Sequence, residues 1–433
     1  MQKLILKNFG PIPNCTIEIK DFILFIGEQA TGKSTICKAI YFFKSIKDEV
    51  KTHLHDIINK GLNSNQRFPG AINSAIRYKF VNLFGMTKYK ETFYLRFDYD
   101  NDVSLEISIT QDEKKYLNFT FSEKLVKQVR ELEEQAHYQY VSLKNINPSN
   151  ELYLKLERHE YFLLMDRGVN KLFNDFRENF YIPAGRGLLA LLTNQLLNIE
   201  LKNMDYITSD FMKLIQRERT NFDTSISTLF ENEEIYNKST KRKKLAATVK
   251  DILKGEYYYK EDKEYIRLKN KGWIPINFAS SGQQEILWIL NLLFLWILQD
   301  KKIFVVIEEP EAHLFPKAQK EIVDFIAMFA NSNENQVMIT THSPYILTAA
   351  NNLLYAGKIG NIVNDDVDKI IQKEKWLKSS SFSAYMVGAS KNDYIKSIID
   401  EELQEIASEE IDRISGVIRD EYAQIYNLEV KND

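Results

Sequence analysis

The stretch FILFIGEQATGKSTICKAIYFFKSI, residues 22–46, decides the fold. Its first five residues are all apolar and predict a buried central strand, and the apolar spacing after residue 35 predicts a helix. Between the two, Gly27, Gly32, Lys33 and Ser34 satisfy the pattern G-x-x-x-x-G-K-[ST]. A glycine loop between strand and helix presents backbone N–H groups to a polyphosphate at the helix N-terminus. The sequence therefore predicts a nucleotide phosphate site.

The residue types of this loop indicate what each part of it does. We expect Lys33 to reach the β- and γ-phosphates and the Ser34 hydroxyl to bind Mg²⁺. The glycines permit the backbone angles that the loop requires. The residues predicted to bind ATP here are Gly27, Glu28, Gln29, Ala30, Thr31, Gly32, Lys33, Ser34 and Thr35.

Two later apolar strands are each followed by a candidate functional group. IFVVIEEPE, residues 303–311, places Glu308 and Glu309 at the carboxyl end of a strand, the edge where open α/β sheets bind ligands. We expect Glu308 to hold Mg²⁺ through water and Glu309 to activate the water that attacks the γ-phosphate. His342 follows the strand QVMITT and is expected to hydrogen-bond the γ-phosphate or that water. Lys33, Glu309 and His342 are the predicted catalytic residues.

The order of four motifs along the chain resembles the ABC-type ATPase head of the RecF, SMC and OLD group. The motifs are the phosphate loop, SSGQQE, IEEPEAH and ITTH. In that group a signature loop of the type S-G-G-Q begins a helix and binds the γ-phosphate of the nucleotide held by the opposing subunit. The resemblance assigns this role to Ser281, Gly282 and Gln283, with Gln283 in place of the second glycine. It also matches Pro310–Leu314 to the D-loop and His342 to the switch histidine.

The resemblance implies a composite site that a second copy of the chain completes. ATP would then join two heads into a homodimer. A larger homo-oligomer is an alternative assembly. Glu308 stands where the wider group usually has aspartate, which lengthens the reach to the metal and is expected to slow hydrolysis. The loop YIPAGRG, residues 181–187, contains Arg186, for which phosphate contact, coupling of the insertion to the site and a plain exposed loop arginine are alternative interpretations.

The predicted fold class is α/β: a phosphate-loop mixed sheet plus an antiparallel sheet, with an inserted helical subdomain and a helical C-terminal tail. Three period-two runs between residues 92 and 121 predict the antiparallel sheet. The expected parts are an N-terminal part of the head with the phosphate loop at 1–121, a mainly helical insertion at 122–254, a C-terminal part of the head at 255–360 and an acidic helical tail at 361–433.

The composition fits a globular chain in a reducing compartment. The 433 residues include 57 basic and 60 acidic side chains, so a nucleic-acid surface would have to be local. The two cysteines, Cys15 and Cys37, cannot form a disulfide framework. The longest apolar run, Ile286–Leu298, is shorter than the roughly 20 residues of a membrane span and is interpreted as a buried helix. With no leader pattern at the N-terminus, we expect a cytoplasmic protein without a membrane partner.

The segments IPAGR, SSGQQE, EEPEAHLFP and THSPYIL are most similar to the compact ATPase subunits of bacterial anti-phage defence systems of the PARIS and Septu type. This resemblance implies an ATP-dependent sensor or scaffold that controls a separately encoded effector, a nuclease or toxin. One alternative is a RecF-like DNA-repair ATPase that clamps duplex DNA, for which the basic stretch Lys238–Lys244 is the main support. Another is a structural subunit that binds ATP with negligible turnover.

Overall fold

The computed structural model describes residues 2–85, 92–109, 117–146, 150–192, 204–223, 236–269, 272–390, 393–407 and 419–424. Within these ranges, its centre is a six-stranded sheet with the strand order β14-β13-β3-β12-β11-β7. Neighbours from β13 to β7 pair in parallel, whereas β14 is antiparallel to β13. The strands are β3 (Phe22–Ile26), β7 (Glu178–Ile182), β11 (Ile303–Glu308), β12 (Gln336–Thr341), β13 (Phe382–Val387) and β14 (Ile395–Ser397).

A second, antiparallel sheet has the strand order β2-β1-β4-β5-β6. Its last three strands are the period-two runs of the sequence, so the predicted combination of a mixed sheet and an antiparallel sheet is confirmed. The strands are β1 (Lys3–Phe9), β2 (Ile12–Glu18), β4 (Tyr94–Asp100), β5 (Val103–Ile109) and β6 (Leu117–Phe121).

Two apolar cores meet at the central sheet. Along β3, Ile23 and Phe25 join the core that holds the antiparallel sheet and α1 (Lys33–Lys60), while Leu24 joins the other core. Successive side chains of a strand point to opposite faces, so one buried strand serves both cores. The second core is built around α8 (Ser281–Leu298), α9 (Pro316–Ala330) and α10 (Pro344–Gly360).

Helix α8 is the segment interpreted from its sequence as a buried helix, and that interpretation is confirmed. By length and composition it is apolar enough to cross a membrane, yet 72% of it is buried inside the fold. A helix that is apolar on all sides fits a core position. Its role here is to carry the SSGQQE segment at its first turn against the rest of the head.

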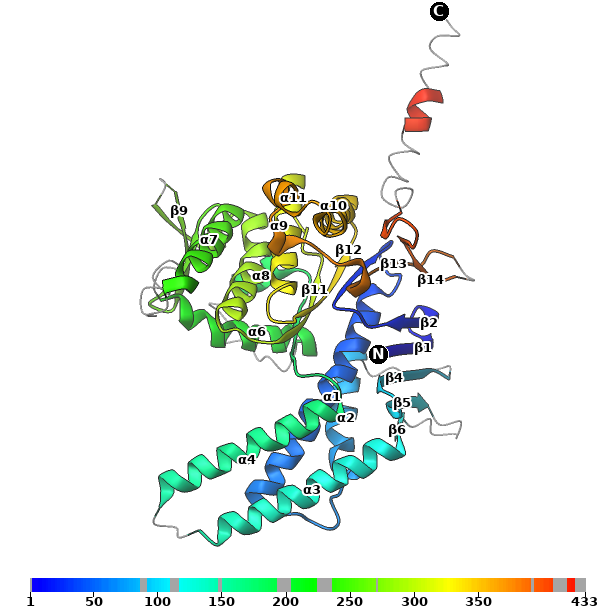
Figure 1. Cartoon of the computed structure of the whole chain (residues 1–433), viewed down its shortest axis with the longest axis vertical. Coiled ribbons are helices and arrows are strands. Elements are labelled where there is room, and N and C mark those ends of the chain that lie inside the picture. The colour runs from blue at the N-terminus through cyan, green and yellow to red at the C-terminus, as the bar shows by residue number, and fades with distance from the viewer. Residues whose placement is uncertain are drawn as a thin grey trace, which may run out of the picture.

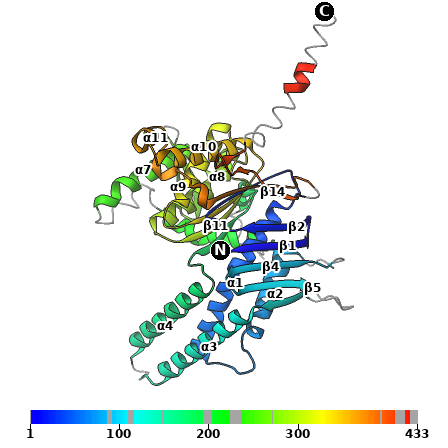
Figure 2. The same ribbon diagram turned by 45° about the vertical axis from the view of Figure 1, so that its right-hand side comes forward.

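The insertion begins as a pair of antiparallel helices, α3 (Glu123–Lys144) and α4 (Glu151–Leu172), that projects from the head with α1 beside it (Figures 1 and 2). The chain then returns to the central sheet as β7, which lies inside the range 122–254 that was predicted as mainly helical. The strand ENFYI begins with two polar residues and therefore lacks the solid apolar run that marked β3. The further helices are α2 (Gly70–Phe84), α5 (Arg186–Leu192), α6 (Tyr206–Glu218) and α7 (Tyr236–Leu253).

A small sheet precedes α8, with the strand order β10-β9-β8. The sequence suggested a hairpin over residues 256–278, and the structure adds a third strand to it. The strands are β8 (Glu256–Lys260), β9 (Lys263–Leu268) and β10 (Gly272–Pro275).

The segment after residue 360 corrects the expectation of a helical tail. It contains α11 (Asn364–Ile370), but its main structural contribution is β13, which pairs with β3 from Phe382↔Phe22 to Met386↔Ile26. Two short strands follow, β15 (Ile399–Asp400) and β16 (Glu405–Ile406). Part of the acidic run, including Glu409, Glu410 and Asp412, lies outside the described residues.

Candidate functional site

The phosphate loop connects the carboxyl end of β3 to the first turn of α1, as predicted. Gly27 has φ +154°, and a Cβ atom there would lie 2.2 Å from the Val387 carbonyl oxygen of β13. Gly32, with φ +96°, caps α1 in the left-handed region. Both positions therefore require glycine on the evidence of backbone geometry alone. The close approach of β13 therefore requires glycine at position 27 independently of any phosphate, which the sequence motif could not show.

Lys33 is held at the loop by two carbonyl groups. Its Nζ donates to the carbonyl oxygens of Gly27 at 2.8 Å and Glu28 at 2.7 Å. Burial lowers the pKa of Lys33, while the nearby carboxylates, Glu309 foremost, oppose that shift. The ammonium group is thus placed over the loop, where a phosphate oxygen could replace a carbonyl oxygen as its acceptor.

Glu308, the last residue of β11, is buried and anchored. Its Oε1 accepts a hydrogen bond from the Tyr181 hydroxyl at 2.6 Å, and its Oε2 accepts one from the Ala184 N–H at 3.2 Å. Burial and the charge of Glu308 raise the pKa of Tyr181 well above its ordinary value, so Tyr181 stays a donor. The carboxylate and the exposed Ser34 hydroxyl are the hard oxygen donors that Mg²⁺ prefers, so this donor set fits the metal.

Glu309 leaves the strand in a different direction. Its φ is +43°, and its N–H donates to the Thr340 carbonyl oxygen at 2.9 Å. The side chain is 40% exposed, and its Oε1 lies 3.4 Å from Nε2 of His342, which is 30% exposed. The structure therefore brings Glu309 and His342 together at the carboxyl ends of β11 and β12, where the sequence predicted both.

Glu311 lies in the segment Pro310–Leu314, but the sequence analysis gave it no role of its own. Its Oε1 accepts hydrogen bonds from the Thr341 hydroxyl at 2.7 Å and from the His342 N–H at 2.8 Å. Its Oε2 is buried and has no hydrogen-bond partner among the described residues. Glu311 thus fixes the backbone that carries His342. The only available signal was a third acid in the segment EEPE.

Arg186 is buried, with 1% of its surface exposed, so the interpretation as an exposed loop arginine is wrong. Its guanidinium donates to the carbonyl oxygens of Pro183 at 2.6 Å, Glu308 at 2.6 Å, Glu309 at 2.8 Å and Glu285 at 2.8 Å. These bonds engage Nε and both terminal nitrogens of the guanidinium. They favour the coupling interpretation over phosphate contact, because Arg186 links α8 to the turn that carries both acids.

The SSGQQE segment begins α8 with a capping box. Ser280, one residue earlier than Ser281, is the N-cap. Its hydroxyl accepts a hydrogen bond from the Gln283 N–H, and the Gln283 side-chain oxygen accepts one from the Ser280 N–H. The Gln283 amide also donates to the Leu253 carbonyl oxygen at 2.9 Å. A Cβ atom on Gly282 would lie 3.0 Å from the His313 carbonyl oxygen, so the segment Pro310–Leu314 packs on this turn. Ser281 is exposed, whereas the Gln283 amide is engaged within its own chain.

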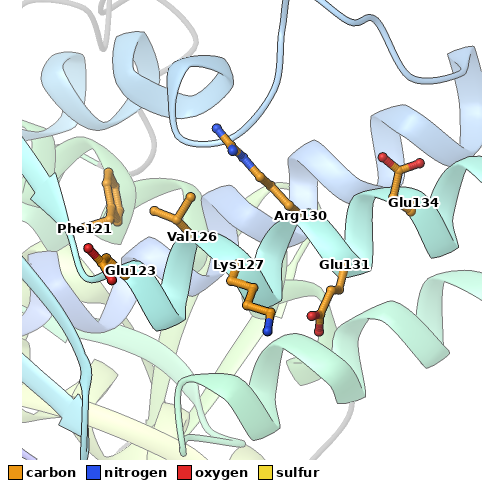
Figure 3. Close-up of a pocket in the computed structure, with 7 residues that line it drawn as sticks. All are labelled: Phe121, Glu123, Val126, Lys127, Arg130, Glu131 and Glu134. Carbon is orange, nitrogen blue, oxygen red and sulfur yellow. The ribbon is translucent and has the colours of Figure 1, made fainter.

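The hollow drawn in Figure 3 is not part of this arrangement. It has a volume of about 530 Å³ and lies along α3, where Figure 3 shows both acidic and basic side chains around it. None of the predicted site residues lines it. The lining residues are Phe121, Glu123, Val126, Lys127, Arg130, Glu131 and Glu134.

Comparison with known proteins identifies a family. The family model described as AAA ATPase domain matches residues 1–347. The lipoprotein-releasing system ATP-binding protein LolD of Neorickettsia sennetsu is 26% identical over 95 residues, which is 22% of this chain. That match spans 40% of the LolD protein, so the chain covers less than half the length of this curated relative.

The solved structures that match this chain include heads of Smc proteins. The SMC head domain from Thermotoga maritima has a TM-score of 0.34 and 13% identity, over 80% of this chain and 90% of that one. An Smc head bound to the C-winged helix domain of ScpA has a TM-score of 0.38 and 13% identity, over 81% of this chain and 91% of that one.

Proposed function

Because this chain belongs to the AAA ATPase domain family, whose model matches residues 1–347, we propose that it binds and hydrolyses Mg²⁺·ATP where β3, β11 and β12 end. The observation that carries the proposal is the convergence of Lys33, Glu308, Glu309 and His342 at that one sheet edge. In this scheme the phosphate loop, residues 27–35, binds the polyphosphate, and Ser34 with Glu308 holds the metal. Mg²⁺ would neutralise charge on the phosphates when it is bound.

The proposed chemistry of hydrolysis rests on two side chains. Glu309 aligns the attacking water and accepts its proton, and the partly exposed carboxylate can meet that water. His342, 3.4 Å from Glu309, donates to the γ-phosphate or orients the same water. Glu308 is held by Tyr181 and Ala184 and stays at the metal position. Positioning and charge stabilisation supply most of the barrier reduction in phosphoryl transfer.

We further propose that two copies form a homodimer across their ATP sites, with Ser281 and Gly282 of each copy facing the nucleotide of the other. The segments that carry or flank the motifs also expose large apolar side chains, which a second copy of the chain would cover in such a dimer. These side chains are Leu188 at 64% exposed, Phe278 at 75%, Phe315 at 79% and Tyr345 at 53%. A Cβ atom on Gly282 would lie 3.0 Å from the His313 carbonyl oxygen, so the first turn of α8 and the segment Pro310–Leu314 are adjacent within one chain.

ATP turnover and ATP-dependent dimerisation can be tested on one pair of proteins. The wild-type chain is expected to release phosphate with Mg²⁺ and not with EDTA. Glu309→Gln is expected to bind ATP and to sediment as a dimer with ATP but not with ADP. As a matched control, the exposed Glu160 on α4, changed to Gln, should behave as wild type. A Glu309→Gln protein that hydrolyses ATP at the wild-type rate would refute the general-base role.

The biological role that we propose is the sensor or scaffold subunit of a cytoplasmic anti-phage defence system, acting on a separately encoded nuclease or toxin. Its support is the motif resemblance to PARIS-type and Septu-type ATPases. The test is capture of tagged Glu309→Gln protein from its host with ATP, followed by mass spectrometry and nucleic-acid quantification. A stoichiometric effector supports the role, and duplex DNA without a protein partner supports the DNA-repair clamp instead.

A further inference from the structure

We propose that the outer face of the sheet β8–β10 binds single-stranded nucleic acid, with a base stacked on Trp273 and phosphates met by Lys260, Lys263 and Arg267. This site is separate from the ATP site, and the proposal does not depend on ATP hydrolysis. Figure 1 shows β9 at the periphery of the molecule, away from the central sheet.

The small sheet has two faces of opposite character. Tyr257 and Ile266 are fully buried and point into the α8 core, where the Tyr257 ring lies 5.3 Å from that of Trp288. The opposite face carries two cross-strand pairs, Tyr258 with Tyr265 and Trp273 with Arg267. Because side chains alternate along each strand, Lys260 and Lys263 belong to this second face as well. Aromatic and basic side chains thus share the solvent side.

The Trp273 ring is partly exposed and packs against a buried aromatic side chain. Its ring centroid lies 4.6 Å from that of Tyr258, which is only 4% exposed, whereas Trp273 itself is 46% exposed. The Lys260 ammonium lies 5.3 Å and the Arg267 guanidinium 5.9 Å from the indole centroid. A ring that is already fixed loses little conformational freedom when a base stacks on it. Base–aromatic stacking beside cations is the usual means by which proteins hold unpaired strands.

The charge on this face also favours a polyanion. Lys260, Lys263 and Arg267 are all exposed. Among the acids of β8 and β9, Glu256 pairs with Lys250 at 2.9 Å, and Glu264 accepts a hydrogen bond from Tyr257 on the buried face at 2.6 Å. The turn residues Glu261 and Asp262 lie at the far end of the β8–β9 hairpin. We therefore place the stacked base at Trp273 on β10, with the phosphates reaching Arg267 and the Lys260–Lys263 pair beside that turn.

Stacking distinguishes the proposed ligand from two other polyanions. A duplex keeps its base faces covered, so it could use the cations but not Trp273. An acidic polypeptide could likewise pair with the cations without stacking on the indole. The proposal therefore requires that Trp273 contribute to affinity and that an unpaired strand bind more tightly than the duplex of the same sequence.

Intrinsic fluorescence offers a specific readout of this site. Trp288 and Trp296 are 1% exposed and Trp376 is 8% exposed, so of the four tryptophans Trp273 is the one that a stacked base would quench. Titration of the full chain, without ATP, with 20-nucleotide oligo(dT) and oligo(U) is expected to quench emission. Anisotropy of labelled oligonucleotides should show affinity falling about tenfold or more for Trp273→Ala, while Trp273→Phe retains most of it.

Charge variants and controls complete the test. Lys260→Glu with Arg267→Glu should weaken binding and flatten its dependence on salt. Tyr138→Ala, which removes an aromatic side chain on α3 that is 74% exposed, should bind as wild type. The proposal is overturned if Trp273→Ala binds the oligonucleotides normally, if duplex binds as tightly as single strand, or if poly-glutamate quenches Trp273 with equal affinity.

Discussion

Nε2 of His342 lies 3.4 Å from Oε1 of Glu309, at the ends of two neighbouring buried strands. For Glu309→Gln, we expect a fall in kcat of about 100-fold to 10,000-fold with ATP affinity unchanged, because an amide cannot accept the proton of the attacking water. Single-turnover phosphate release and equilibrium binding of labelled ATP separate the two effects. Loss of ATP binding in the variant would show instead that Glu309 is needed to form the site.

Glu311 is expected to position His342 without touching the nucleotide. In Glu311→Ala the Thr341 hydroxyl and the His342 N–H lose their shared acceptor, so kcat should fall about tenfold or more while KM stays near the wild-type value. Glu311→Gln keeps an acceptor oxygen and should recover most of the rate. Equal losses in the two variants would contradict a positioning role.

Lys33→Ala should abolish ATP binding, because it removes the cation placed over the phosphate loop. Isothermal titration with a non-hydrolysable ATP analogue measures this loss directly. Lys38 lies on the same helix without a predicted phosphate contact, and Lys38→Ala serves as the control that should keep wild-type affinity. A Lys33→Ala protein that binds the analogue as tightly as wild type would contradict the assignment of residues 27–35 as the phosphate loop.

Arg186 is expected to matter for stability and for catalysis together. Arg186→Met leaves the carbonyl groups of Pro183, Glu308 and Glu309 without their donor and Glu285 without its cation, so unfolding in urea should become easier by about 3–5 kcal/mol. ATP binding should persist at low temperature, whereas ATP-driven dimerisation should weaken because α8 and the acid turn are no longer linked. A variant with wild-type stability would contradict this account.

A buried charge cluster away from the site makes stability depend on pH. Lys44 Nζ lies 2.9 Å and Lys47 Nζ 3.4 Å from Oδ2 of Asp175, with all three side chains at most 2% exposed. Burial lowers the pKa of Lys44 to about 8, although Asp175 opposes the shift. Burial would raise the pKa of Asp175, but Lys44 and Lys47 together hold it below its ordinary value.

Asp175→Asn should therefore destabilise the fold by about 3–5 kcal/mol at pH 7, since it leaves two buried ammonium groups unpaired. Folded Lys44 loses its proton near pH 8 and the unfolded chain near 10.5, so the unfolded state binds more protons between these values and stability from this group rises with pH there. The cost of Asp175→Asn should accordingly shrink at pH 9.5. Urea unfolding at both pH values, with the exposed Asp56→Asn as control, measures it.

The sequence predicted those parts of the molecule that carry a strong local pattern. The solid apolar runs at β3, β11 and β12, each followed by a polar motif, correctly predicted that Lys33, Glu309 and His342 lie at the same sheet edge. The sequence did not reveal β7 or β13, because ENFYI and FSAYMV contain no solid apolar run as long as that of β3 and their partner strands lie far along the chain. The burial of Arg186 was equally hidden, since its acceptors are backbone carbonyl groups that no residue pattern specifies.

The strand β13 has a consequence for where this enzyme can be cut. Sequence similarity to the family stops at residue 347, yet the strand that presents the phosphate loop has a neighbour at residues 382–387. The Tyr394 hydroxyl also donates to the Thr31 carbonyl oxygen at 3.1 Å, so a residue beyond β13 contacts the phosphate loop directly. A chain shortened to residue 347 would leave β3 as a bare sheet edge, which invites aggregation. The end of the family match therefore falls inside the folded head. Proteolysis between residues 347 and 382 would cut the chain between β3 and its neighbour β13, and would inactivate the site instead of removing a dispensable tail.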